Sequence, residues 1–178
     1  SPDPDVEPPG MPLIALDIET IHIVDNPDFS NPEHWIPFCV AVGFCDRSGS
    51  IETDVIFRED GTLDAERQLL LSVADWIEER VSRQGRVLLT YNGRAYDMPV
   101  LEHRARKCGV YDRLDGTVID DTLRHTDLME VMVDKHGSHV SLNAALNEFR
   151  IEVNDDGAEW LGKELSGADM PDFVLELL

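Results

Sequence analysis

The sequence has few basic residues, and lysine is the scarcest of them. It contains 36 Asp and Glu against 15 Lys and Arg, a formal net charge of −21, and its only lysines are Lys107, Lys135 and Lys163. Such a chain either repels nucleic acid or is adapted to molar salt, where a dense carboxylate surface stays hydrated. Because the Debye length falls to about 3 Å at 1 M salt, we favour a salt-adapted organism, and the net charge then says little about partners.

Cysteine is also scarce, and no apolar run is long enough to span a membrane. Cys39, Cys45 and Cys108 form no CxxC pair and are odd in number. This disfavours a disulfide framework and favours a reduced, intracellular setting. Residues 1–10 are acidic and rich in proline, which predicts a flexible tail rather than a secretory signal. We therefore expect a cytoplasmic protein with no membrane partner.

Residues 11–178 are expected to form one domain with a sizeable core. Strands are predicted at residues 12–18 (buried on both faces), 37–45, 51–57, 86–91 and 117–120. Helices are predicted at residues 64–83, 97–108, 128–134 and 142–149, with a last one from Pro171. The connection from residue 20 to 36 is long, and long ordered connections are often functional. This order of elements predicts an α/β fold, a mixed sheet flanked by helices.

Two carboxylates interrupt the first predicted strand, in the run LIALDIET. Asp17 and Glu19 lie two residues apart, so a strand places both on one face, roughly 6–7 Å apart. Buried acids are costly unless a cation such as Mg²⁺ compensates their charge. The same spacing recurs in less apolar surroundings, where water or the helix dipole explains it, at Asp5/Glu7 and Asp64/Glu66. The pattern alone is compatible with half of a metal site or with a solvated strand end.

A second candidate segment, Tyr91 to Asp97 (YNGRAYD), follows a strand and opens a helix. Its plain interpretation is a strand-to-helix turn with Asn92 or Asp97 as the helix cap. The functional interpretation places Asp97 at the C-terminal edge of the sheet, facing Asp17 and Glu19, because ligands of open α/β sheets collect at strand ends.

Together the two segments resemble a known family. The run DIET (residues 17–20) is similar to the first motif of the DEDD 3′–5′ exonucleases, and NGRAYD (residues 92–97) is similar to their second. The aromatic residue before the Asp most resembles the proofreading domain of family-B DNA polymerases and its stand-alone relatives, over about residues 11–178. The resemblance implies a ribonuclease H-like fold and removal of nucleotides from the 3′ end of single-stranded DNA.

The resemblance also implies roles for individual residues. In that family four carboxylates hold two Mg²⁺ or Mn²⁺ ions, which makes Asp17, Glu19 and Asp97 the implied catalytic residues and metal ligands. One ion would activate the attacking water, and the other would stabilise the leaving 3′-oxygen. The implied substrate-binding residues adjoin these acids: Ile18 through its backbone, Thr20, Asn92, and Tyr96 by stacking on a base.

The third motif of the family, a Tyr or His four residues before an Asp on the last helix, is not found before Leu178. We therefore expect either a domain without its last helix or an incomplete site. His125 and Asp127 are candidate substitutes, although helix capping by Asp127 is the favoured interpretation. Two other groups favour plain interpretations. They are His136 and His139, as loop residues rather than zinc ligands, and Arg104, Arg106 and Lys107, as a solvated helix face rather than a phosphate contact.

The expected function is metal-dependent 3′–5′ exonuclease action on single-stranded DNA ends, with a replication or repair protein as the candidate partner. An RNA exonuclease of the same superfamily would use the same residues, because the choice depends on contacts to the 2′-hydroxyl. A catalytically incomplete exonuclease-fold binding module would account for the missing third motif.

Overall fold

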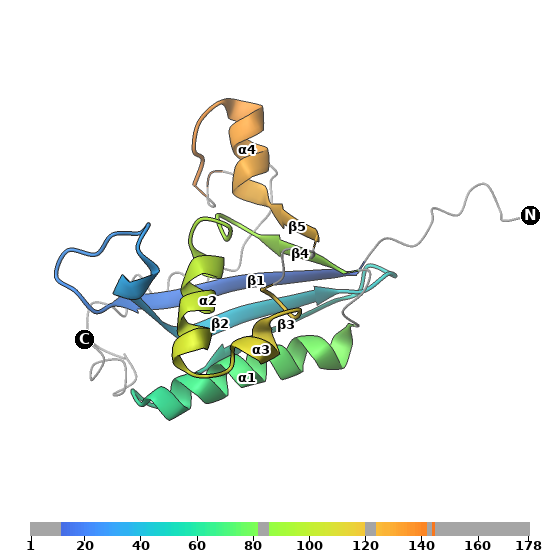
Figure 1. The fold of residues 1–178 in the computed structure, drawn as a ribbon. Helices are drawn as coiled ribbons and strands as arrows, with labels where there is room; N and C mark the ends of the chain where they lie inside the picture. Colours follow the sequence, from blue (N-terminus) through green and yellow to red (C-terminus); the bar gives the residue numbers. More distant parts are fainter. Residues whose placement is uncertain (1–11, 82–85, 120–123, 142–143, 145–178) are drawn as a thin grey trace, which may run out of the picture.

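The computed structural model describes residues 12–81, 86–119, 124–141 and 144. Within them, five strands form one mixed sheet in the order β3-β2-β1-β4-β5 (Figure 1). The strands are β1 (Leu13–His22), β2 (Trp35–Cys45), β3 (Ile51–Phe57), β4 (Val87–Thr90) and β5 (Arg124–Asp127). β1 runs antiparallel to β2 but parallel to β4, and β4 runs parallel to β5. The carboxyl ends of β1, β4 and β5 therefore point to the same edge of the sheet.

Four α-helices accompany the sheet in the described part of the chain. They are α1 (Leu63–Arg80), α2 (Asp97–Lys107), α3 (Tyr111–Leu114) and α4 (Leu128–His136), together with the short 3₁₀ helix η1 (Pro32–His34). Figure 1 shows α1, α2 and α3 on one side of the sheet and α4 beyond β5. The predicted α/β fold with a mixed sheet is confirmed.

The core lies between that side of the sheet and its helices. Alternate residues of β1, among them Ile14 and Leu16, are buried with the apolar side of α1, including Leu69 and Ile77. This follows from the two side-chain periods, two residues in a strand and 3.6 in a helix. The hydroxyl of Thr62 accepts a 3.1 Å hydrogen bond from the backbone N–H of Ala65 and so caps the start of α1.

A buried ion cluster joins α1 to α2 inside this core. Glu66 on α1 is 1% exposed and accepts two hydrogen bonds, of 2.5 and 2.6 Å, from the Arg104 guanidinium on α2. Arg58 lies 3.5 Å from the same carboxylate. Glu66 does lie in the first turn of α1, as the helix-dipole explanation requires, but its carboxylate is also part of a buried ion cluster. The solvated-face interpretation of Arg104 is wrong, because Arg104 is 3% exposed. Arg106 does lie on the exposed side of α2, paired with Glu102.

Three other predictions need correction. No strand forms at residues 117–119, because they belong to a turn closed by an isolated bridge between Asp115 and Ile119; the fifth strand is β5. The first strand is buried on one face only, since α1, α2 and α3 all cover that face and leave Asp17 exposed on the other. The helix predicted at residues 128–134 continues to His136, so this histidine is not a loop residue.

A pocket of about 320 Å³ with a mostly apolar lining lies on the sheet, and Asp17 is one of its lining residues. The tail at residues 1–10, most of the helix predicted at 142–149 and the helix from Pro171 lie outside the described residues. Within the described ranges, no helix is both long and apolar enough to cross a membrane.

Candidate metal and nucleic-acid site at the end of strand β1

Strand β1 extends past its parallel neighbour, and this overhang carries the first two candidate ligands. β4 pairs only with residues Leu13 to Ala15 of β1. Asp17 and Glu19 lie beyond that pairing, and the charges of both act on Asp97 at the start of α2. The burial of Asp17 raises its pKa, although part of its surface stays exposed. Burial, and next the charge of Asp17, raise the pKa of Glu19 to about 7.

The turn between β4 and α2 positions the third carboxylate. Asn92 takes a left-handed backbone conformation with φ 61°, which asparagine tolerates better than most residues. A Cβ on Gly93 would lie only 2.4 Å from the hydroxyl oxygen of Thr90, so this position requires glycine. The N–H of Met98 then donates to the carbonyl of Gly93 at 2.8 Å, and α2 begins at Asp97.

Asp97 is the most confined of the three acids. It is 3% exposed, and its carboxyl group accepts a hydrogen bond from the backbone N–H of Ile18. Its other oxygen, Oδ2, is buried and has no hydrogen-bond partner among the described residues. Burial first, then the charge of Asp17, raise the pKa of Asp97 to about 8. The structure thus brings Asp97 into the electrostatic field of Asp17 and Glu19.

These three acids suit a divalent cation in their chemistry. Each pKa is raised, which means that each negative charge lacks compensation from the protein. Carboxylate oxygens are the ligands that Mg²⁺ and Mn²⁺ prefer, and Asp97 Oδ2 is a buried oxygen without a donor. Within the described part of the chain, however, no three His, Cys, Asp or Glu side chains close around one point as a finished metal cluster.

The predicted substrate-binding residues lie around the same acids. Thr20 and Tyr96 are joined by a hydrogen bond between their hydroxyl groups. Tyr96 is half-buried, and the loss of solvent raises its pKa, with smaller contributions from the three acids. Ile18 is 4% exposed, and its N–H is engaged by Asp97. The nucleotide contacts of these residues and of Asn92 stay predictions.

Asp127 holds the turn and caps a helix. It is 3% exposed, and its two carboxylate oxygens accept hydrogen bonds from the backbone N–H groups of Asn92 (2.7 Å), Arg94 (3.1 Å) and Met129 (3.0 Å). The capping interpretation is therefore confirmed. His125 is hydrogen-bonded to the hydroxyl of Thr90 at 2.7 Å, and burial lowers its pKa.

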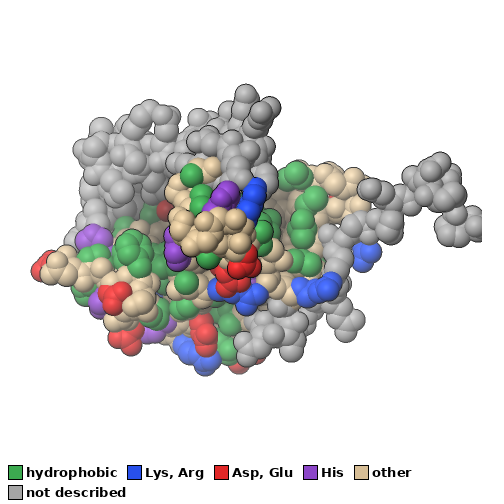
Figure 2. Space-filling view, turned by 90° about the horizontal axis from the view of Figure 1, so that it is seen from above, with side chains coloured by type: hydrophobic (Ala, Val, Ile, Leu, Met, Phe, Trp, Pro, Cys, Tyr) green, Lys and Arg blue, Asp and Glu red, His purple; other side chains and the backbone are tan. Residues whose placement is uncertain are grey.

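An aromatic group beside the site was not predicted from the sequence. Phe29, Trp35 and Tyr96 have their ring centroids within 6 Å of one another. The only sequence signal was the long connection between residues 20 and 36. Figure 2 shows Lys and Arg side chains in separate small groups on the described part of its face, rather than as one continuous basic surface.

The comparisons with known proteins agree with this geometry. A family described as the RNase_H superfamily matches residues 15–169. The chain belongs to the RNase H superfamily. The resemblance drawn from the two motifs is thereby confirmed at the level of the superfamily, together with the ribonuclease H-like fold class.

Two solved structures share the RNase H-like fold of the chain. A family-B DNA polymerase from the hyperthermophilic archaeon Pyrobaculum calidifontis aligns with a TM-score of 0.61 and 22% identity, over 85% of this chain and 20% of that one. Exonuclease I aligns with a TM-score of 0.55 and 16% identity, over 83% of this chain and 37% of that one. The chain thus spans well under half of either protein. A comparison with curated protein sequences finds no significant match. At 16% and 22% identity, these two alignments show a shared fold.

Proposed function

We propose that this chain is the nuclease domain of a metal-dependent 3′–5′ exonuclease that acts on single-stranded DNA ends. The observation that carries the proposal is the buried, unpartnered Oδ2 of Asp97 next to the two acids of β1, Asp17 and Glu19. Three carboxylates with raised pKa values destabilise a cation-free protein, so their presence near one another calls for a function.

In this proposal Asp17, Glu19 and Asp97 hold two Mg²⁺ or Mn²⁺ ions. Such a pair, when bound, supplies an activated water and stabilises the leaving 3′-oxygen of an in-line displacement. The protein's own contribution is to orient the three carboxylates. The N–H of Ile18 fixes one oxygen of Asp97 and leaves the other free to bind the cation.

The single-stranded DNA is positioned by Thr20, Tyr96 and Asn92. The hydroxyl groups of Thr20 and Tyr96 already share a hydrogen bond, so a terminal nucleotide meets a preformed polar edge rather than two mobile side chains. The Tyr96 ring offers a base a stacking surface. With a net charge of −21, affinity for the strand would depend on the cations, stacking and hydrogen bonds more than on basic side chains. The acidic composition also supports a salt-adapted organism.

A second candidate function is a catalytically incomplete module that binds single strands without cleaving them. In this function the three acids would bind cations and a nucleic-acid strand without the fourth carboxylate and the water-orienting group that the third motif of the family supplies. RNA is the alternative substrate under either function, because the same residues would bind it.

The proposal is tested with a 5′-labelled single-stranded DNA, a 3′-blocked copy and the matching RNA, each with Mg²⁺, Mn²⁺ or chelator. We expect stepwise shortening from the 3′ end that requires a cation and is abolished by Asp17→Asn. Asp64→Asn, which removes the same charge from a first-turn position of α1, is the matched control and should keep wild-type activity. Cation-dependent binding without shortening would favour the incomplete module. If the protein neither binds nor cleaves any of these substrates, both functions are refuted.

A further inference from the structure

Phe29 is exposed in an unusual way for a large apolar residue. It lies in the connection between β1 and β2, and 69% of its surface is open to solvent. That surface is left after one side of the ring stacks on Trp35, with centroids 4.7 Å apart and ring planes 23° apart. A ring that served only to cover Trp35 would itself be expected to pack into the domain. Here one aromatic face is held in place and the rest is presented to solvent.

The support under Phe29 is rigid. Trp35 is 6% exposed, and its indole N–H donates a 2.9 Å hydrogen bond to the backbone carbonyl of Asp28. The backbone N–H of Asp28 donates to His34 at 3.0 Å, and its carboxylate accepts from Ser30. The hydrogen bonds of Asp28 and Ser30, the two sequence neighbours of Phe29, therefore hold its backbone in place. A stacking surface ordered in advance binds a base at a lower entropy cost than a mobile one.

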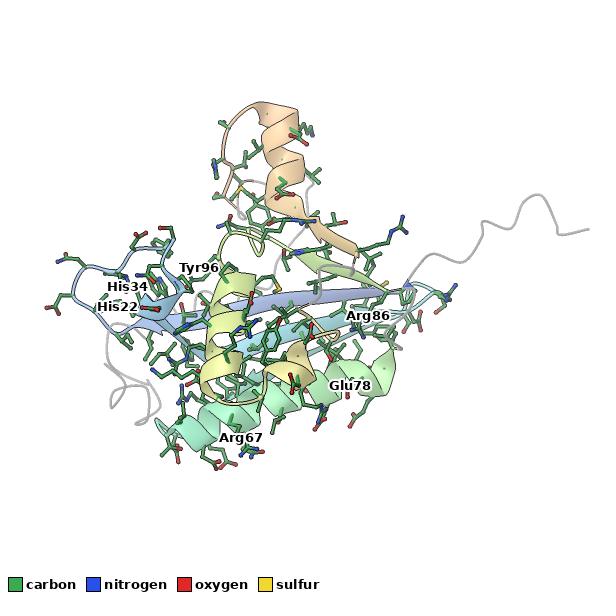
Figure 3. All side chains as sticks on the ribbon, viewed as in Figure 1. His22, His34, Arg67, Glu78, Arg86 and Tyr96 are labelled. Carbon is green, nitrogen blue, oxygen red and sulfur yellow. The ribbon has the colours of Figure 1, made fainter. Side chains whose placement is uncertain are left out.

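The same aromatic group reaches the candidate metal site. The Tyr96 ring lies 5.7 Å from Phe29 and 5.6 Å from Trp35, between centroids. Tyr96 in turn is hydrogen-bonded to Thr20 and immediately precedes Asp97. Figure 3 shows His22, His34 and Tyr96 gathered around this connection and the first turn of α2, away from Arg86 at the other end of the sheet. We call Phe29, Trp35 and Tyr96 the aromatic shelf.

We propose that the shelf continues the single-strand path away from the carboxylates, and that Phe29 stacks on a base behind the 3′-terminal nucleotide. This inference rests on the proposed function and adds a residue that determines how the strand is held. Every base has a π face, so stacking is tolerant of sequence. Stacking also needs no basic side chain, which suits a chain with 36 acidic and 15 basic residues.

The experiment compares the full chain with Phe29→Ala, Phe29→Leu and Phe29→Trp. Binding is measured by the anisotropy of a 5′-labelled oligodeoxyadenylate with Ca²⁺ in place of Mg²⁺. A second oligonucleotide carries 2-aminopurine next to its 3′ end, where stacking on an aromatic ring quenches the fluorescence. Ile51→Ala is the matched control, because Ile51 is 73% exposed and its strand partner is Cys45, at the far end of the sheet.

We expect Phe29→Ala and Phe29→Leu to weaken binding by about five-fold or more and to lose the quench. Phe29→Trp and Ile51→Ala should stay within about two-fold of wild type. Melting temperatures would identify a folding defect in Phe29→Ala. In that case, the difference in binding between Phe29→Leu and Phe29→Trp tests whether an aromatic ring is required. If the wild type binds or shortens DNA while Phe29→Ala does both equally well, the inference alone fails. If the wild type does neither, the proposed function fails and takes the inference with it.

Discussion

The backbone N–H of Ile18 donates a hydrogen bond to the carboxyl group of Asp97. This contact ties the first turn of α2 to the strand that carries the other two acids, although the residues are far apart in the sequence. It satisfies one oxygen of Asp97 and leaves the buried Oδ2 without a donor. The backbone of β1 is therefore tied to the start of α2, while the negative charge of Asp97 is not fully compensated.

The first prediction concerns pH and Asp97. Its pKa is about 8 in the folded protein and near 4 in an unfolded chain. Between these values the folded state holds a proton that the unfolded state has lost, so the free energy of unfolding falls as the pH rises. Asp97→Asn removes this penalty and should stabilise the cation-free protein at pH 8 by about 1 kcal/mol or more. Urea unfolding in chelator measures it, and the gain should shrink towards pH 4.

The wild type carries many other acids, so its own pH dependence is not diagnostic. The difference between wild type and Asp97→Asn reports Asp97 together with its coupling to Asp17 and Glu19. A difference that stays constant from pH 4 to pH 8 would contradict the raised pKa.

The second prediction concerns Gly93. Alanine here would place a Cβ 2.4 Å from Thr90 Oγ1 and 2.5 Å from its Cβ. Neither atom is the end of a flexible side chain, so the turn must shift. We expect Gly93→Ala to cost about 2 kcal/mol or more in unfolding free energy. Gly43→Ala is the control, because its nearest neighbour, Ala15 Cβ, would lie at 3.4 Å. Equal melting temperatures for the two variants would refute the steric argument.

The third prediction concerns the buried ion cluster. Glu66→Ala leaves the buried guanidinium groups of Arg104 and Arg58 without their carboxylate, and breaking such a cluster costs about 3–5 kcal/mol. Glu102→Ala removes the exposed partner of Arg106 and should leave the melting temperature almost unchanged, because ion pairs in water contribute little. A small effect of Glu66→Ala would mean that the cluster is dispensable.

The fourth prediction separates capping from metal binding at Asp127. Its carboxylate accepts from three backbone N–H groups, so Asp127→Ala should cost about 1–2 kcal/mol. Asp127→Asn keeps one acceptor oxygen and should cost less. Neither variant should change Mn²⁺ affinity in a calorimetric titration. A loss of affinity in Asp127→Asn would make this residue a ligand.

The sequence predicted best where local signals decided the structure. α1 and β2 were predicted to within three residues at each end, because their buried apolar residues lie close together in the sequence. β3 is mostly exposed, and its observed bounds were predicted from its β-branched residues and the turn before it. β5 was missed because its sequence, RHTD, contains no apolar residue at all. This strand depends on its register with β4, which no local pattern encodes.

The residues of the candidate site likewise fall into those that local sequence motifs predict and those that only the fold brings together. Asp17, Glu19 and Asp97 could be proposed as ligands because two short motifs carry them in one order. The aromatic shelf could not be predicted, because Phe29, Trp35 and Tyr96 share no period and meet only in the fold. The buried pairing of Glu66 was not predicted for the same reason, because its partner Arg104 lies 38 residues away.

The central claim is that Asp17, Glu19 and Asp97 together bind divalent cations, and a Mn²⁺ titration tests it most directly. The titration should be done at pH 8 in 1 M KCl, where the Debye length is about 3 Å and the charges of the surface carboxylates are screened. We expect saturable Mn²⁺ binding with proton release. That binding should be lost in Asp17→Asn and in Asp97→Asn and kept in Asp64→Asn. Equal binding by all four proteins, or none by the wild type, would contradict it.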